Sequence, residues 1–188
     1  MPKIITRKSN IRLKEYDYSQ SNYYFITACC ENKLKLFGAV INDEMVLNGA
    51  GKMVEQTLIE IPNFYHGLSL DTHIIMPNHI HAIIIIQNNK LTNNGQAQGP
   101  VPTYLSLSDI IHRIKTLSTK KYIDGVKNNG WPRFNKKIWQ RSFHEHIIRD
   151  EKSLNNIREY IRTNPATWDR DIENPNNIDN IELNEIRV

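Results

Sequence analysis

The chain has 188 residues, which suits one domain with a sizeable core and leaves little room for a second. Its only two cysteines, Cys29 and Cys30, are adjacent, so no disulfide framework is expected and a reducing compartment is the default. The N-terminus is basic and polar, and no stretch approaches the roughly 20 apolar residues of a membrane span. We therefore expect a cytoplasmic protein with no membrane association.

The net charge of +4 is unevenly distributed. Residues 169–188 hold six acidic and two basic side chains, whereas residues 1–168 hold 22 basic and 14 acidic ones. A basic body suits a polyanionic partner, above all nucleic acid, although it can also serve only solubility. We expect residues 169–188 to form a flexible acidic tail, which either competes with DNA phosphates for the basic body or is simply a solvated terminus.

The hydrophobic pattern predicts an alternation of strands and helices between a basic arm and the acidic tail. In chain order we expect an arm at 1–21, a strand at 23–30, a hairpin at 37–47, a helix at 50–61, two strands between 68 and 87, a mobile polar loop at 88–103, a helix that begins at Ser106 or Ser108, a strand at 138–149 and a helix at 151–163. This order favours an α+β fold with a ferredoxin-like antiparallel sheet and helices packed against it, within a domain at 22–168.

His79 and His81 lie inside the long apolar run between Gly67 and Gln87. Residues i and i+2 of a strand share a face, so His79 and His81 project together, while Ile80 points to the other side. Two imidazoles on a rigid strand need only one or two further donors to form an open catalytic metal site. Either histidine alone would more often be a hydrogen-bonded core or edge residue. His144 and His146 have the same spacing, but for them phosphate contact or packing is the better interpretation.

Three segments resemble the REP-associated tyrosine transposases and related single-strand transposases of the HUH endonuclease superfamily. They are RLKEYDYSQSNYYFITACCENKLKLFG near the N-terminus, MPNHIHAI at Met76 to Ile83 and WQRSFHEHIIRDEKSLNNIREYIRTNPATW at Trp139 to Trp168. The resemblance covers most of residues 10–168, but neither the loop at 88–103 nor the acidic tail.

The resemblance implies a metal-dependent endonuclease and strand transferase that cuts one strand of hairpin-forming repeat DNA through a 5′-phosphotyrosine intermediate. The histidine pair of the family falls on His79 and His81, and its catalytic tyrosine on Tyr160. A polar side chain one helical turn after the tyrosine completes the metal site in related proteins, and Asn164 is the matching position. The family implies Mg²⁺ or Mn²⁺, and two imidazoles with one amide would bind Mn²⁺ more tightly.

The expected partner is single-stranded or hairpin DNA, bound by a monomer or a homodimer. Basic side chains predict the contacts to its phosphates: Arg7, Lys8, Arg12, Lys14, Lys115, Arg141 and Arg149. The main alternative is a non-catalytic module that binds single-stranded DNA or RNA on a ferredoxin-like sheet, although no RNP-type aromatic motif is visible. A replication initiator or relaxase of the HUH type would share the metal and tyrosine, but 188 residues leave no room for the larger domains of those proteins.

Overall fold

The computed structural model of the protein describes residues 22–87 and 106–177. Its longer elements are β1 (Asn22–Cys29), β2 (Gly38–Ile41), β3 (Glu44–Leu47), α1 (Gly49–Glu60), β4 (Leu68–Ile75), β5 (His79–Ile86), α2 (Leu107–Asn128), β6 (His144–Ile148) and α3 (Glu151–Thr163). Short 3-10 helices lie at η1 (Glu31–Lys33), η2 (Ile61–Phe64) and η3 (Pro165–Arg170). The predicted arm at 1–21, the predicted loop at 88–103 and residues 178–188 of the tail lie outside the described residues.

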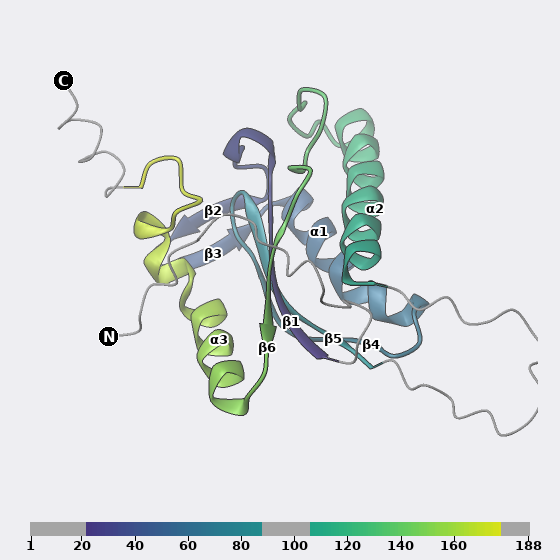
Figure 1. Ribbon diagram of the computed structural model, residues 1–188. Coiled ribbons are helices and arrows are strands. Elements are labelled where there is room, and N and C mark those ends of the chain that lie inside the picture. The colour runs from purple at the N-terminus through teal and green to yellow at the C-terminus, as the bar shows by residue number, and fades with distance from the viewer. Residues whose placement is uncertain (1–21, 88–105, 178–188) are drawn as a thin grey trace, which may run out of the picture.

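Four strands form one antiparallel sheet in the order β4-β5-β1-β6, and β2 and β3 form a separate hairpin. Figure 1 shows α1 and α2 on one side of the sheet and α3 on the other. The predicted α+β fold with a ferredoxin-like antiparallel sheet is confirmed. The predicted short hairpin is also present, and its turn residues Asn42 and Asp43 both have positive φ, as a tight two-residue turn requires.

The two faces of the sheet are built from alternate residues of the same strands. On β5, Ile80, Ala82, Ile84 and Ile86 join the large apolar cluster under α1 and α2. His79, His81 and Ile83 point the other way, because successive side chains of a strand alternate. Ile83 packs with Ile157 and Ile161 of α3 in a second, smaller apolar cluster. One strand therefore supplies the core on one face and two buried histidines on the other.

Each long helix begins at a side chain that caps its free backbone N–H groups. Asn48 caps α1, Ser106 caps α2 in a capping box with Asp109, and Asp150 caps α3. Each such cap typically contributes about 1 kcal/mol to helix stability. Within residues 22–87 and 106–177, no helix is both long and apolar enough to cross a membrane.

The strand predicted at 138–149 is shorter in the structure, since β6 begins only at His144. The preceding residues run beside the end of β1 instead, where Gln140 N–H donates to the Cys29 carbonyl and Glu31 N–H to the Ile138 carbonyl. The Lys115 ammonium binds the carbonyls of Gln140 and Ser142 at 2.9 and 2.8 Å. The carbonyls of Gln140 and Ser142 therefore accept hydrogen bonds from Lys115 and not from a neighbouring strand.

The prediction of a flexible tail from residue 169 onward is wrong for its first part. Residues 169–177 are described, and Asp171, Glu173, Asn174 and Asn177 are all buried. The reason is local: Asp171, Asn174 and Asn177 bind backbone groups of their own segment, as when Asn174 donates to the Trp168 carbonyl at 3.0 Å. Composition predicted solvation, but hydrogen bonding within the segment and to the sheet fixes it in place.

Candidate active site

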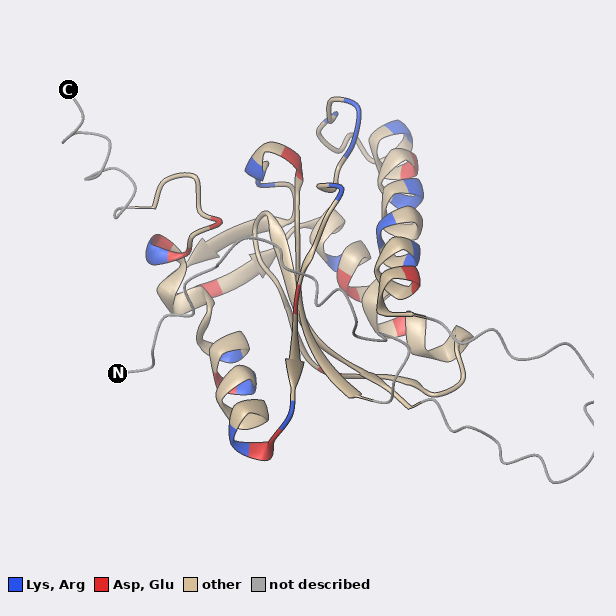
Figure 2. Cartoon of the chain, in the orientation of Figure 1, with Lys and Arg blue, Asp and Glu red and all other residues tan. Residues whose placement is uncertain are grey.

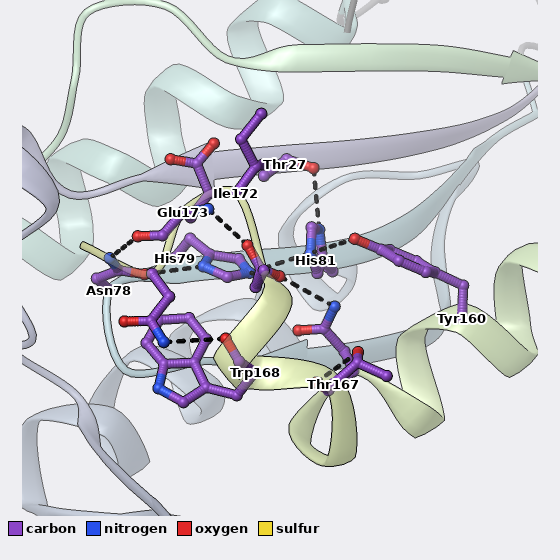
Figure 3. Close-up of polar contacts among 12 residues, drawn as sticks. Thr27, Asn78, His79, His81, Tyr160, Thr167, Trp168, Ile172 and Glu173 are labelled. Carbon is purple, nitrogen blue, oxygen red and sulfur yellow. Dashed lines mark hydrogen bonds and ion pairs between the residues drawn. The ribbon is translucent and has the colours of Figure 1, made fainter. Parts of the chain in front are cut away.

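His79 and His81 lie on the face of the sheet that carries α3, with 0% and 1% of their surface exposed. Their Nε2 atoms are 3.0 Å apart (Figure 3). Across the ladder, His79 lies opposite Cys29 and His81 opposite Thr27. Because the two histidines are two residues apart on β5, their imidazoles lie side by side on one face with their Nε2 atoms adjacent.

Asn78 fixes the tautomer of His79. Its Nδ2 donates to the backbone carbonyls of Glu173 at 2.6 Å and Lys33 at 3.2 Å, so this atom must be the amide nitrogen. The amide oxygen then faces Nδ1 of His79 at 2.9 Å and can only accept. Nδ1 of His79 therefore carries the proton, and Nε2 presents a lone pair in the neutral imidazole. Metal-ligating histidines are held in this way by a partner on the other ring nitrogen.

Thr27 holds His81 from the opposite side, with Oγ1 2.9 Å from Nδ1. A hydroxyl can donate or accept, so two arrangements satisfy the ring. In one, His81 Nε2 donates its proton to His79. In the other, His81 Nδ1 donates to Thr27 and both Nε2 lone pairs converge, an arrangement that a cation stabilises.

A carboxylate completes the cluster, because Asp171 Oδ2 lies 3.9 Å from His79 Nε2. His79, His81 and Asp171 are all buried, and their ligating atoms lie within 4.8 Å of one another. Two imidazoles and a carboxylate suit Mn²⁺ and other divalent first-row cations. In addition, Oδ1 of Asn164 is buried without a hydrogen-bond partner. The donor set and this unsatisfied oxygen both fit a divalent cation.

Tyr160 projects from α3 toward the same point, with its hydroxyl 3.4 Å from His81 Nε2 (Figure 3). Its ring packs edge-on against Phe25 and His81, and 44% of its surface is exposed. The Tyr160 side chain therefore lies partly open to solvent beside a buried cluster.

An ion pair holds α3 over this part of the sheet. Arg158 binds Asp71 of β4 through two contacts, Nε to Oδ1 at 2.8 Å and Nη2 to Oδ2 at 2.5 Å. The Arg158 guanidinium lowers the pKa of the Asp71 carboxyl, chiefly through these hydrogen bonds. Leu70 packs against the apolar cluster under α1 and α2, so the alternation of side chains along β4 places the next residue, Asp71, on the α3 face. The ion pair therefore fixes the helix that carries Tyr160.

Asn164 follows α3 with helical backbone angles, φ −56° and ψ −39°, although Pro165 comes next. The α3 turn thus continues into η3, and Asn164 lies close to the cluster. Its Nδ2 donates to Asp171 Oδ2 at 3.2 Å. The side chain predicted from the family resemblance to be the third ligand is therefore present in the site, but as a donor to a carboxylate.

His144 and His146 lie on β6, outside this cluster. Within the described residues, the group of three possible metal ligands comprises His79, His81 and Asp171. Partial burial and the positive charge of Arg149 lower the pKa of His146. The expectation that this second pair serves packing or phosphate contact stays a prediction.

The predicted phosphate contacts fall into three groups. Arg141 and Arg149 are exposed and flank β6. Lys115 is occupied by two backbone carbonyls, and burial lowers its pKa to about 8, which argues against the predicted phosphate contact. The last group lies outside the described residues: Arg7, Lys8, Arg12 and Lys14.

Lys and Arg residues also occur along α2 and the connection that follows it (Figure 2). Residues 107–142 hold nine basic and two acidic side chains. The end of this connection runs beside the end of β1, one strand from His79. The connection after α2, which carries Arg133, Lys136, Lys137 and Arg141, therefore reaches the end of the sheet at which the histidine cluster lies.

Sequence reasoning missed three residues of the site. Asn78 precedes the first histidine within the quoted motif, and its role depends on two carbonyls distant in sequence. Thr27 belongs to a different strand and is brought to His81 by register. Asp171 stands in the segment assigned to the acidic tail, where composition gave no sign of burial.

No model of a known protein family matches the chain. Its structure is similar to that of a REP-associated tyrosine transposase solved bound to a REP hairpin, with a TM-score of 0.55 and 20% identity, over 86% of this chain and 74% of that one. A putative transposase from Deinococcus radiodurans matches with a TM-score of 0.46 and 15% identity, over 79% of this chain and 93% of that one.

The first of these likenesses shows that the protein has the fold of the REP-associated tyrosine transposase, in agreement with the resemblance of its motifs. In sequence, the chain is 42% identical over 177 residues to an uncharacterized protein of Haemophilus influenzae, covering 89% of this chain and 93% of that protein. The chain belongs to the same family as this Haemophilus influenzae protein.

Proposed function

We propose that the protein is a metal-dependent, HUH-type single-strand DNA endonuclease and strand transferase with Tyr160 as its nucleophile. The observation that carries the proposal is the contact between Tyr160 and the buried histidine pair. The hydroxyl lies 3.4 Å from His81 Nε2, and a carboxylate of the same cluster lies 3.9 Å from His79 Nε2. A tyrosine that merely packed at the rim of a sheet would not need two buried imidazoles and a buried carboxylate beside its oxygen.

His79, His81 and one or both of Asp171 and Asn164 would hold the metal, with Mg²⁺ or Mn²⁺ as the proposed ion. When bound, the cation would polarise a non-bridging phosphate oxygen and offset the charge that develops in the transition state. Asn78 and Thr27 orient the imidazoles. A phenol with a pKa of about 10 attacks only after losing its proton, so the position of Tyr160 beside the cluster is favourable.

In the proposed reaction, Tyr160 Oη forms a bond to phosphorus and the bond from phosphorus to the 3′-oxygen breaks. The 3′-oxygen leaves as a hydroxyl after gaining a proton, and the 5′-phosphate remains as an ester on Tyr160. This exchange of one phosphodiester for another retains the bond energy. A 3′-hydroxyl from the same or another strand can therefore reverse the step without ATP.

Single-stranded or hairpin DNA is the proposed substrate. The solved transposase of similar fold is bound to a REP hairpin. On this protein, the exposed Arg141 and Arg149 and the basic surface of residues 107–142 supply charge for phosphates. A non-catalytic DNA- or RNA-binding module would use the same charge but has no need for the histidine cluster.

Replacement of Tyr160 by Phe tests the proposal, because it removes the nucleophilic oxygen and keeps the ring that packs on Phe25. We expect Tyr160→Phe to abolish cleavage of a labelled hairpin oligonucleotide in Mn²⁺ and to bind it as tightly as the wild type. Cleavage by the Phe variant at the wild-type rate would remove Tyr160 from the reaction. Binding without cleavage by the wild type, in Mn²⁺ and Mg²⁺ alike, would favour the binding module.

A further inference from the structure

We infer that Asp171 is the third protein ligand of the metal, supplied by a segment that follows the catalytic helix, and that Asn164 positions its carboxylate. The inference rests on the proposed metal site and names the residue that completes it. The family resemblance predicts Asn164 as this ligand. The hydrogen bonds and the burial of the described residues assign this place to Asp171.

The segment that carries Asp171 is tied to the site on two sides. Lys33 donates its ammonium to the Ile172 carbonyl at 2.6 Å, and the Asn78 amide that orients His79 donates to the Glu173 carbonyl at 2.6 Å. Asn177 donates to the Arg170 and Asp171 carbonyls at 3.1 and 3.0 Å. One amide thus connects a metal-facing histidine to the backbone beside Asp171. The position of Asp171 is set by the same contacts that build the histidine pair.

Two neutral donors, the Asn164 amide and the Glu173 N–H, bind the Asp171 carboxylate, but no Lys or Arg among the described residues pairs with it. Within residues 22–87 and 106–177, the side chain in ion-pair range of this carboxylate is that of His79, and Lys33 pairs with Glu173 instead. Asp171 is 8% exposed. Burial of an ionised carboxylate is unfavourable unless a cation or several donors offset it. A divalent cation between Asp171 and the two Nε2 atoms would supply that charge.

The two carboxylate oxygens of Asp171 make different contacts. Oδ1 accepts the Glu173 backbone N–H at 2.6 Å, which closes a turn, and Oδ2 is the oxygen nearest His79. Asn164 Nδ2 donates to Oδ2 at 3.2 Å, while its own Oδ1 has no partner. Hard cations such as Mg²⁺ and Mn²⁺ favour a carboxylate oxygen. Asn164 therefore acts through Asp171, as a positioning residue that holds the liganding oxygen toward the imidazoles.

The test is the affinity of the full chain for Mn²⁺ alone, measured by calorimetry for the wild type, Asp171→Asn, Asp169→Asn and His79→Ala. Asp171→Asn is nearly isosteric and keeps Oδ1 for the Glu173 N–H. Its new amide can donate to Asn164 Oδ1 after that side chain turns over. The fold should therefore persist, which circular dichroism verifies. Asp169 is exposed on η3 and is the matched control.

We expect Asp171→Asn to weaken Mn²⁺ binding by more than roughly 10-fold. Loss of a residue that only hydrogen-bonds to a metal ligand already lowers metal affinity by about 10-fold or more, and loss of the ligand itself should lower it further. Asp169→Asn should bind like the wild type. A metal-free melting curve separates liganding from a structural role: Asp171→Asn should then melt no lower than the wild type, but gain less from added Mn²⁺.

Two results would overturn the inference. If Asp171→Asn binds Mn²⁺ like the wild type while His79→Ala does not, the metal site stands and Asp171 is not its ligand. If Asp171→Asn melts below the wild type without metal and gains as much from Mn²⁺, its role is structural. Absence of Mn²⁺ binding by the wild type would contradict the proposed metal site as well as this inference.

Discussion

The protein carries two histidine pairs of identical spacing on the same face of one sheet. Thr27 of β1 lies opposite His81 on one side and His144 on the other, so both pairs point toward α3. His79 and His81 are buried beside a carboxylate, whereas His146 is exposed on the edge strand β6. Spacing and face are therefore insufficient to make a metal site.

Surroundings make the difference between the pairs. Asn78 and Thr27 hold the inner nitrogens of His79 and His81, and Tyr160 approaches from α3. The pair on β6 is instead flanked in sequence by two cations, Arg141 and Arg149. Positive neighbours disfavour a bound cation and favour a phosphate. The comparison favours the first pair as the candidate metal site and predicts DNA contact for the surface around the second.

The largest expected effect is a contrast between alanine variants of the two pairs. His79→Ala and His81→Ala should each abolish cleavage and weaken Mn²⁺ binding by at least about 100-fold, because two remaining donors hold the ion poorly. His144→Ala should keep the Mn²⁺ affinity of the wild type. Calorimetry and an oligonucleotide assay measure both quantities. An equal loss of Mn²⁺ affinity and cleavage in the His144 variant would show that the two pairs do not differ in function. Cleavage that persists in EDTA would contradict the metal site.

A smaller effect is expected from Asp71→Asn, which weakens the ion pair that fixes α3 over the first histidine pair. Cleavage at pH 7 should fall by up to roughly 100-fold, the effect of about 1 Å of misplacement. Mn²⁺ binding should remain, since none of the proposed ligands changes. A variant that cleaves at the wild-type rate would show that Arg158 and Asp71 do not position Tyr160.

The same variant has a defined pH signature. Because Arg158 lowers the folded-state pKa of Asp71 below its ordinary value of 3.8, the ion pair stabilises the fold above that pH. Its contribution is lost as pH falls through the lowered pKa. Chemical unfolding should find Asp71→Asn less stable than the wild type at pH 7 and nearly equal at pH well below 3.8. A stability difference that does not change with pH would contradict this assignment.

The smallest expected effects distinguish two cations near the start of β6. Arg141→Ala should weaken hairpin binding a few-fold and lower the slope of log K against log salt by about 1, as loss of one phosphate contact does. Lys115→Met should leave that slope unchanged and lower the melting temperature, because the carbonyls of Gln140 and Ser142 lose their donor. Titrations at several salt concentrations, with parallel melting curves, measure the difference. An unchanged salt slope for Arg141→Ala would show that Arg141 does not contact a DNA phosphate.

The fold was predictable because its signals are local. Asn48, Ser106 and Asp150 stand where helices begin, and β5 with its β-branched run begins directly after the turn that precedes His79. The strand at 138–149 was predicted too long, since alternation of residue types cannot show that carbonyls 140 and 142 bind Lys115.

The candidate site was predictable only in part. The spacing of His79 and His81 predicts that they share a face of the strand, whereas Tyr160 was predicted from the family resemblance. Asp171 was missed because its burial depends on long-range contacts, among them the one from Asn78 to the Glu173 carbonyl. A charge count treats residues 169–188 as one acidic tail. Its first residues instead form part of the site.

The central claim is that Tyr160 becomes joined to DNA in a reaction that needs the first histidine pair and its metal. Incubation with a hairpin oligonucleotide in Mn²⁺, trypsin digestion and mass spectrometry locate the adduct directly. The account predicts a nucleotide 5′-phosphate on the peptide Glu159 to Arg162, present with His144→Ala and absent with His81→Ala or EDTA. An adduct on any other residue, or one on Tyr160 that forms equally well in EDTA, would contradict it.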